Sequence, residues 1–236
     1  MVDVAYKDLC IDVTAGIGRP AAVARFWADV LGLDISTAGG EDFKLSAPDD
    51  GPPERTIWIN AVPEDIAGKS RVHLDLAVPD GDPSLLLGAG ASVIRSPDGG
   101  RPWHVLEDPD GAVLCVFPAA ADQPQPTVTQ LVVDADEPLQ IATWWAERTG
   151  ATVHRHPTRP FVWLEGVAGL PFARWEFNPV PEVKTHKNRI HWDVTLVDAS
   201  VDDLVAAGAT VLRNPTGTSD WWVLADPEGN EFCAFR

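Results

Sequence analysis

The stretch VHLDLAV at residues 72–78 decides the fold, because it recurs 118 residues later as IHWDVTL at residues 190–196. The same offset relates GASVIRSP at residues 90–97 to GATVLRNP at residues 208–215. One constant offset across separate segments is the signature of an internal repeat. The chain is therefore predicted to be a tandem duplication.

Further matches carry the duplication to the end of each copy. At the same spacing lie four pairs: Trp103 with Trp221, Asp108 with Asp226, Cys115 with Cys233, and Phe117 with Phe235. Towards the N-terminus the offset becomes 122, which places an insertion in the first copy around residues 15–18. We expect domains at residues 1–118 and 128–236, joined by a polar, proline-bearing linker at residues 119–127.

Each copy is predicted to contain two units of strand, helix and three strands. Residues 8–13 alternate polar and apolar side chains, which is the pattern of a strand with one packed face. Pro20 and Gly32 bound a segment with apolar residues at helical spacing, and Pro138 and Gly150 bound its counterpart. A single unit leaves sheet edges open, so we expect the two units of one copy to join. The predicted fold class is α+β, with curved, cup-shaped mixed sheets and helices outside.

The composition excludes several classes of partner. The chain has 35 acidic and 18 basic residues, for a net charge of −17, so nucleic acid and anionic membrane surfaces are not expected to bind. It has neither a signal-peptide pattern nor a long apolar run, which predicts a cytoplasmic protein. Three cysteines are too few for a disulfide framework. We expect a monomer rather than a homodimer, because a tandem chain already contains a pair of domains.

The order of motifs resembles the vicinal oxygen chelate superfamily, and in particular glyoxalase-like and bleomycin-resistance-type domains. The resemblance lies in the helix with Phe26-Trp27 followed by Leu31-Gly32, the HLDL strand, the GA-x-V strand and the DP-x-G hairpin. It covers nearly the whole chain, as two tandem glyoxalase-like domains. A bacterial resistance or biosynthetic setting fits that family. The superfamily includes lyases, isomerases, dioxygenases, thiol transferases and drug binders, so the resemblance implies a fold more than an activity.

The resemblance also implies where a metal ion would bind. Catalytic members hold a divalent ion with four inward-facing side chains, one each on the first, fourth, fifth and eighth strands of a domain. The corresponding positions are Asp8, Trp58 or Asn60, His73 and Cys115 in the first copy, and Gln130, Glu176 or Asn178, His191 and Cys233 in the second. Metal-binding relatives carry glutamate where both copies have cysteine. We therefore expect no metal cofactor, with Ni, Co or Zn held by Gln130, Glu176 and His191 as the alternative.

The leading hypothesis from the sequence is a metal-independent small-molecule-binding protein with an aromatic and acidic pocket in the C-terminal domain. The predicted pocket residues are Gln130, Glu176, His191, Asp193, Trp221 and Cys233. A weaker second pocket is predicted in the first copy, from Asp8, His73, Asp75 and Cys115. Aromatic walls with carboxylates suit a planar or cationic ligand, through stacking and cation–π attraction.

Two other hypotheses stay open. The first is a metal-dependent lyase or isomerase acting on a small carbonyl compound, in which the ion polarises an oxygen and a carboxylate moves the proton. The second is a protein whose cavities are filled by side chains and which acts through its surfaces alone. In the simplest case the His191 and Asp193 side chains form a hydrogen-bonded pair that lines a pocket.

Overall fold

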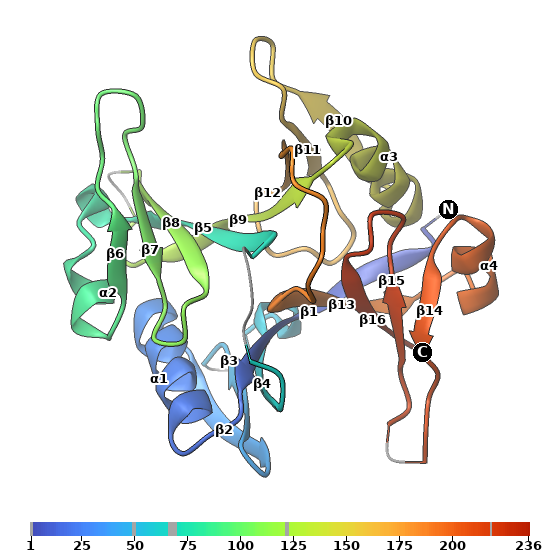
Figure 1. Cartoon of the computed structure of the whole chain (residues 1–236), viewed down its shortest axis with the longest axis horizontal. Coiled ribbons are helices and arrows are strands. Elements are labelled where there is room, and N and C mark those ends of the chain that lie inside the picture. Colours follow the sequence, from blue (N-terminus) through green and yellow to red (C-terminus); the bar gives the residue numbers. More distant parts are fainter. Residues whose placement is uncertain (1, 49–50, 66–69, 121–122, 218) are drawn as a thin grey trace.

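A computed structural model describes residues 2–48, 51–65, 70–120, 123–217 and 219–236, and the structural statements below refer to these residues. The chain forms four units of similar structure, which lie in four quadrants of the molecule (Figure 1). Their strands make two eight-stranded mixed sheets, neither of which closes into a barrel. This architecture confirms the predicted α+β class and the tandem repeat.

The units follow the predicted order of elements. The first contains β1 (Val4–Thr14), α1 (Arg19–Leu31), β2 (Asp34–Gly39), β3 (Asp42–Ser46), the 3-10 helix η1 (Pro53–Arg55) and β4 (Ile57–Val62). The second contains β5 (Val72–Val78), the 3-10 helix η2 (Pro79–Gly81), α2 (Ser84–Gly88), β6 (Ser92–Arg95), β7 (His104–Glu107) and β8 (Val113–Pro118). The third contains β9 (Thr127–Ala135), α3 (Pro138–Thr149), β10 (Thr152–Arg155), β11 (Val162–Glu165) and β12 (Arg174–Pro179). The fourth contains β13 (Ile190–Leu196), α4 (Val201–Ala206), β14 (Thr210–Arg213), β15 (Trp222–Ala225) and β16 (Glu231–Phe235).

Local sequence signals place the helix ends where they were expected. Both long helices stop at a glycine in the left-handed region, Gly32 with φ 65° and Gly150 with φ 72°. A side chain there would strain the backbone, so these glycines end the helices. Ser200 begins α4 with a capping box, because its hydroxyl accepts a bond from the Asp203 amide while the Asp203 carboxylate accepts one from the Ser200 amide.

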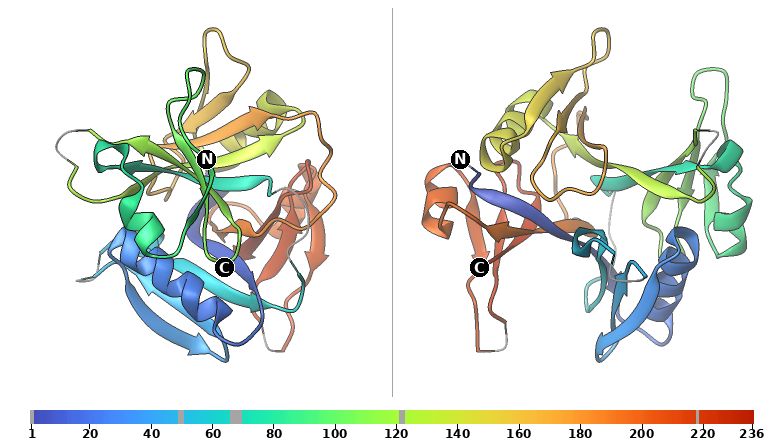
Figure 2. Two further views of the ribbon diagram at one scale, coloured as in Figure 1. Left: turned by 60° about the vertical axis from the view of Figure 1, so that its left-hand side comes forward. Right: turned by 180° about the vertical axis from the view of Figure 1, so that it is seen from behind.

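The pairing of the units differs from the expectation that the two halves of each copy join. Sheet A has the strand order β14-β15-β16-β13-β1-β4-β3-β2, and sheet B has β10-β11-β12-β9-β5-β8-β7-β6. The first unit therefore pairs with the fourth through the antiparallel strands β1 and β13, and the second pairs with the third through β5 and β9. Both views in Figure 2 show the second and third units above the first and fourth.

The apolar faces of the sheets meet in one core. Leu9 on β1 and Leu74 on β5 are fully buried in the same hydrophobic cluster, as are the rings of Trp145, Trp175 and Trp192. The ring of Trp145 on α3 lies 4.8 Å from that of Trp175 in sheet B and 5.4 Å from that of Trp192 in sheet A. Helix α3 thus connects both sheets through aromatic contacts.

A repeated tryptophan–aspartate bond connects the two units of each sequence copy. Trp27 Nε1 donates to Asp108 Oδ2 at 3.2 Å, and Trp145 Nε1 donates to Asp226 Oδ2 at 3.0 Å. The other oxygen of each aspartate accepts backbone N–H groups of the DP-x-G turn. The units of one copy therefore meet through a helix and a hairpin turn, while the sheets join one copy to the other.

Candidate functional site

The structure divides the six predicted pocket residues between the two sheets. Gln130 on β9 and Glu176 on β12 lie in sheet B, whereas His191, Asp193 and Cys233 lie in sheet A. Trp221 stacks on Phe235 of β16 and also belongs to the sheet A side. The predicted set therefore does not form one pocket, because each sheet takes one unit from each copy.

Each sheet instead combines residues from both predicted sets on the polar face opposite the core. On sheet A, the register places Asp8 beside Asp193, Cys10 beside His191, and Asp193 beside Cys233. On sheet B it places Asp75 beside both Gln130 and Cys115. The repeat relates four positions on sheet A to four positions on sheet B. Asp8 corresponds to Gln130, Trp58 to Glu176, His191 to His73, and Cys233 to Cys115.

The carboxylates of β1 on sheet A have partners within the chain. Asp8 forms an ion pair with Lys7 and accepts a hydrogen bond from Trp58 Nε1 at 3.1 Å. Asp12 forms an ion pair with Lys187 and accepts a hydrogen bond from Asn60 Nδ2 at 3.3 Å. Both aspartates are buried, and these partners replace the water that burial removes. The carboxylates of Asp8 and Asp12 therefore have little free hydrogen-bonding capacity for a ligand.

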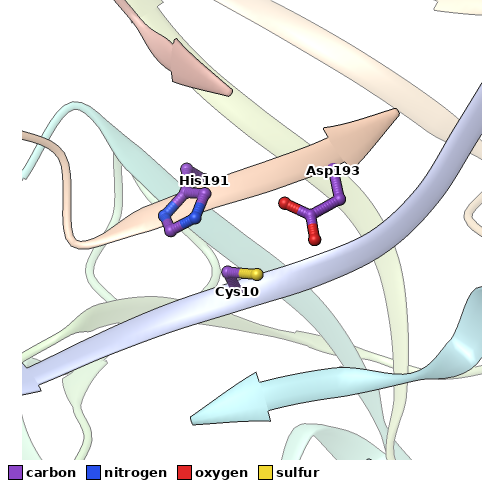
Figure 3. Close-up of side chains that lie close together, drawn as sticks. All are labelled: Cys10, His191 and Asp193. Atoms are coloured by element: carbon purple, nitrogen blue, oxygen red, sulfur yellow. The ribbon is translucent and has the colours of Figure 1, made fainter. Parts of the chain in front are cut away.

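A third carboxylate of sheet A is not matched in this way. Asp193 is 4% exposed, and its Oδ1 has no hydrogen-bond partner among the described residues. Burial raises the pKa of Asp193, and the nearby Asp8 carboxylate adds to this effect. Asp193, His191 and Cys10 bring ligand-type atoms within 4.8 Å of one another (Figure 3). Cys10 was not among the predicted site residues, although its alternation with Asp8 and Asp12 already placed it on the same face.

The polar face of sheet B is more accessible and carries a histidine–carboxylate pair. His73 and Gln130 are half-buried, and His73 Nε2 lies 3.5 Å from Asp75 Oδ1. Burial lowers the pKa of His73, but hydrogen bonding to Asp75 and to Cys115 outweighs it and raises the pKa to about 10. His73 is therefore protonated at neutral pH and lies beside Asp75, whose Oδ1 still has no hydrogen bond among the described residues.

Glu176 is the most perturbed accessible carboxyl group of sheet B. Its burial, together with the negative charge of Asp75, raises its pKa to about 7. A group that titrates near neutral pH can accept or donate a proton there, and it gains most from a positively charged partner. On the same face, Gln130 Oε1 is buried without a hydrogen-bond partner among the described residues. Buried polar atoms in folded proteins are nearly always paired, so this unpaired acceptor indicates a place for a bound molecule or water.

Aromatic side chains lie at two places beside this polar face. Trp163 is the register neighbour of Glu176 on β11, and its ring stacks on that of His154 with an interplanar angle of 13°. Trp103 stacks on Phe117 of β8, two residues beyond Cys115. Trp175, the chain neighbour of Glu176 on β12, is fully buried in the core and does not line this face.

Comparisons with known structures support the architecture as a whole. Glyoxalase I from Zea mays is similar with a TM-score of 0.68 and 14% identity, over 98% of this chain and 92% of that one. A proposed dioxygenase from Bacillus subtilis subsp. subtilis gives a TM-score of 0.64 and 13% identity, over 99% of this chain and 85% of that one. At these identities the likeness concerns the fold. No curated protein sequence matches the chain.

The fold of the chain is the one seen in these two structures. The sequence model of the glyoxalase-like domain matches residues 8–117 and again residues 130–235. The chain therefore belongs to the glyoxalase-like domain family, with two copies in tandem, as the motifs predicted. This fold supports a small-molecule-binding function. No helix among the described residues has both the length and the apolar composition needed to span a membrane.

Proposed function

We propose that the protein binds a small molecule on the polar face of sheet B and needs no metal ion to do so. The ligand site comprises Gln130, Glu176, His73, Asp75 and Cys115, with Trp163 and Trp103 beside it. This set keeps the predicted residues of β9 and β12 and replaces His191, Asp193 and Cys233 by their repeat equivalents. The main support is the unpaired, buried Oε1 of Gln130, on the same polar face as half-buried Glu176.

The chemistry of these groups selects the ligand class. Gln130 Oε1, Asp75 Oδ1 and the Glu176 carboxylate are all acceptors, so a complementary ligand carries hydrogen-bond donors. A positive charge on the ligand holds Glu176 ionised and gains a charge-assisted bond. Trp163 and Trp103 favour a flat ligand through stacking. The proposed ligand is therefore a planar molecule with a cationic nitrogen and N–H donors.

A pair of equivalent substitutions tests the proposed site. Asp75→Asn in sheet B and Asp193→Asn in sheet A change the same residue at repeat-related positions. Tryptophan fluorescence is titrated with proflavine and ethidium as planar cationic probes. We expect saturable quenching, weakened roughly tenfold or more by Asp75→Asn because a charge-assisted bond is lost, and unchanged in Asp193→Asn. Quenching that does not saturate, or that responds only to Asp193→Asn, contradicts the proposal.

A metal-dependent lyase or isomerase is the second candidate, because the pairing of the units places His73 with Gln130 and Glu176. An amide oxygen, a carboxylate and an imidazole suit a divalent ion such as Ni²⁺, Co²⁺ or Zn²⁺, and Cys115 would be the fourth ligand. The unpaired Gln130 Oε1 is compatible with this donor set. Such an ion would supply Lewis-acid polarisation of a substrate carbonyl. A carboxylate outside the donor set would move the proton, and Asp75, the register neighbour of Gln130, is placed for this role.

Elemental analysis separates the two candidates. Purified protein is dialysed against nickel, cobalt or zinc, and Glu176→Ala is treated in parallel. If ligand binding on sheet B needs no metal, the wild type and Glu176→Ala are expected to contain the same amount of metal. One equivalent that disappears in Glu176→Ala favours the enzyme instead.

A further inference from the structure

Three chemically distinct side chains converge on the polar face of sheet A. Cys10 comes from β1, whereas His191 and Asp193 come from β13, and their ligand-type atoms lie within 4.8 Å of one another. Figure 3 shows the Cys10 sulfur and the Asp193 carboxylate close together, with the imidazole of His191 beside them. A thiol, an imidazole and a carboxylate are the ligand types that zinc takes most often in proteins.

Polar atoms of this cluster lack hydrogen-bond partners. Among the described residues, neither Asp193 Oδ1 nor His191 Nδ1 has one, although the two residues are only 4% and 7% exposed. The nearest carboxylate oxygen to His191 Nδ1, Asp12 Oδ2, is 3.8 Å away and beyond hydrogen-bond distance. Two unpaired buried polar atoms in one cluster indicate a place for a bound partner that the described residues do not supply.

His191 and Lys7 act to lower the pKa of Asp193, but neither forms an ion pair with it. Lysines pair with Asp8 and Asp12, but no lysine or arginine of the described residues forms an ion pair with Asp193. Burial raises the pKa of Cys10, and the Asp193 carboxylate raises it further. A divalent cation satisfies the carboxylate, the thiol and the imidazole together.

We propose that Cys10, His191 and Asp193 bind a thiolate-preferring divalent transition metal, Zn²⁺ being the best match. On binding, the S–H bond of Cys10 breaks, a bond from sulfur to the metal forms, and the proton passes to solvent. One thiolate and one carboxylate neutralise the two charges of the ion. Cys233, the register neighbour of Asp193, stands where a fourth ligand would come from.

This donor set differs from the positions that the glyoxalase-like resemblance implies. Those positions on sheet A are Asp8, Trp58, His191 and Cys233, so Cys10 and Asp193 lie outside them. The site is also independent of the ligand site proposed on sheet B. Because β1 and β13 belong to the first and the fourth unit, a bound ion would link distant parts of the sequence and stabilise the fold.

The repeat supplies a matched control. On sheet B, Val132 occupies the place of Cys10, and a second group of ligand-type atoms, from His73, Asp75 and Cys115, lie within 4.8 Å of one another. The variant Cys10→Val gives sheet A the valine that sheet B has at the equivalent position. Cys115→Val removes a buried thiol from sheet B instead.

The experiment measures zinc and cobalt binding by the reduced, full-length protein and by both variants. We expect one equivalent of zinc by elemental analysis, a thiolate-to-cobalt charge-transfer absorption, and a melting temperature about 5–10 °C higher at saturating zinc. Cys10→Val is expected to lose the absorption band and to weaken zinc binding by at least about 100-fold, whereas Cys115→Val retains both.

Three outcomes would overturn the assignment. They are a folded wild-type protein that takes up no zinc, an equivalent of zinc that survives Cys10→Val but not Glu176→Ala, and a cobalt spectrum without a thiolate band. Should Cys10→Val fail to fold, as judged by circular dichroism, Asp193→Asn provides the same test with an isosteric side chain. Asp75→Asn is then the control.

Discussion

Sheets A and B have the same topology and repeat-related residues, yet their polar faces are occupied differently. On sheet A, Asp8 accepts a hydrogen bond from Trp58 and forms an ion pair with Lys7, and Asp12 forms an ion pair with Lys187. On sheet B, the equivalent of Trp58 is Glu176, whose pKa is raised to about 7 because burial leaves it without a full counter-charge. A few substitutions thus convert an internally satisfied face into one whose groups are suited to a ligand, without any change of fold.

The largest expected effect concerns the core that both sheets share. Trp145→Ala removes a fully buried ring with contacts to both sheets and leaves Asp226 without its indole partner. We expect a loss of about 4 kcal/mol in the free energy of unfolding, in a single transition, by urea denaturation followed by circular dichroism. The equivalent Trp27→Ala is expected to cost about 3 kcal/mol. Two separate transitions in the wild type would contradict a shared core.

The next effect tests the contrast between Trp58 and Glu176. The folded-state pKa of Glu176 lies near 7, above its ordinary value of 4.5, so the folded protein binds the proton more tightly. Stability therefore falls as the pH rises from about 4.5 to 7 and stays lower above that range. Glu176→Gln removes this loss and is expected to be about 2–3 kcal/mol more stable than the wild type at pH 8, with little difference at pH 4.

Thermal denaturation across pH provides the measurement for this prediction. Glu165→Gln is the control, since the Glu165 side chain is 44% exposed and its hydrogen bond from Trp163 lowers its pKa. The control is not expected to gain stability at pH 8. Equal curves for Glu176→Gln and the wild type would show that Glu176 is not desolvated.

A smaller effect tests whether the lysine on sheet A satisfies its buried carboxylate. Lys187→Met leaves Asp12 with only the Asn60 amide, and we expect a loss of about 1–2 kcal/mol at pH 7, because the half-exposed lysine is partly screened by solvent. Lys187→Arg retains the charge and is expected to recover most of the loss in urea unfolding. A Lys187→Met variant as stable as the wild type would show that water replaces the lysine.

The smallest effect compares one tryptophan from each polar face. Trp58→Phe removes the bond to buried Asp8 and is expected to cost about 1 kcal/mol. Trp163→Phe removes a bond to half-exposed Glu165, which water can replace, so a few tenths of a kcal/mol are expected. Urea denaturation of both variants gives the comparison, and the reverse ranking would contradict the assignment of sheet A as the internally satisfied face.

The sequence alone determined the repeat, the order of elements in each unit and the family. These features are local or periodic: Gly32 and Gly150 end the helices, the alternation in β1 sets its faces, and the 118-residue offset places His73 and His191 at equivalent positions. It also placed Cys10 on the polar face of β1, where alternation could have marked it as a site residue. Side-chain periodicity is readable because it depends only on neighbours along the chain.

Only the tertiary structure decided which unit pairs with which, and so which histidine lies beside Gln130 and Glu176. Backbone hydrogen bonds at a strand edge carry no sequence information, and the equivalent strands β5 and β13 offer similar edges to β1. The choice depends on packing between distant segments, where Trp27 and Trp145 dock their helices on the hairpin turns of the same copy. As a result, each sheet combines one unit from each copy, and the histidine on the polar face of sheet B is His73 rather than His191.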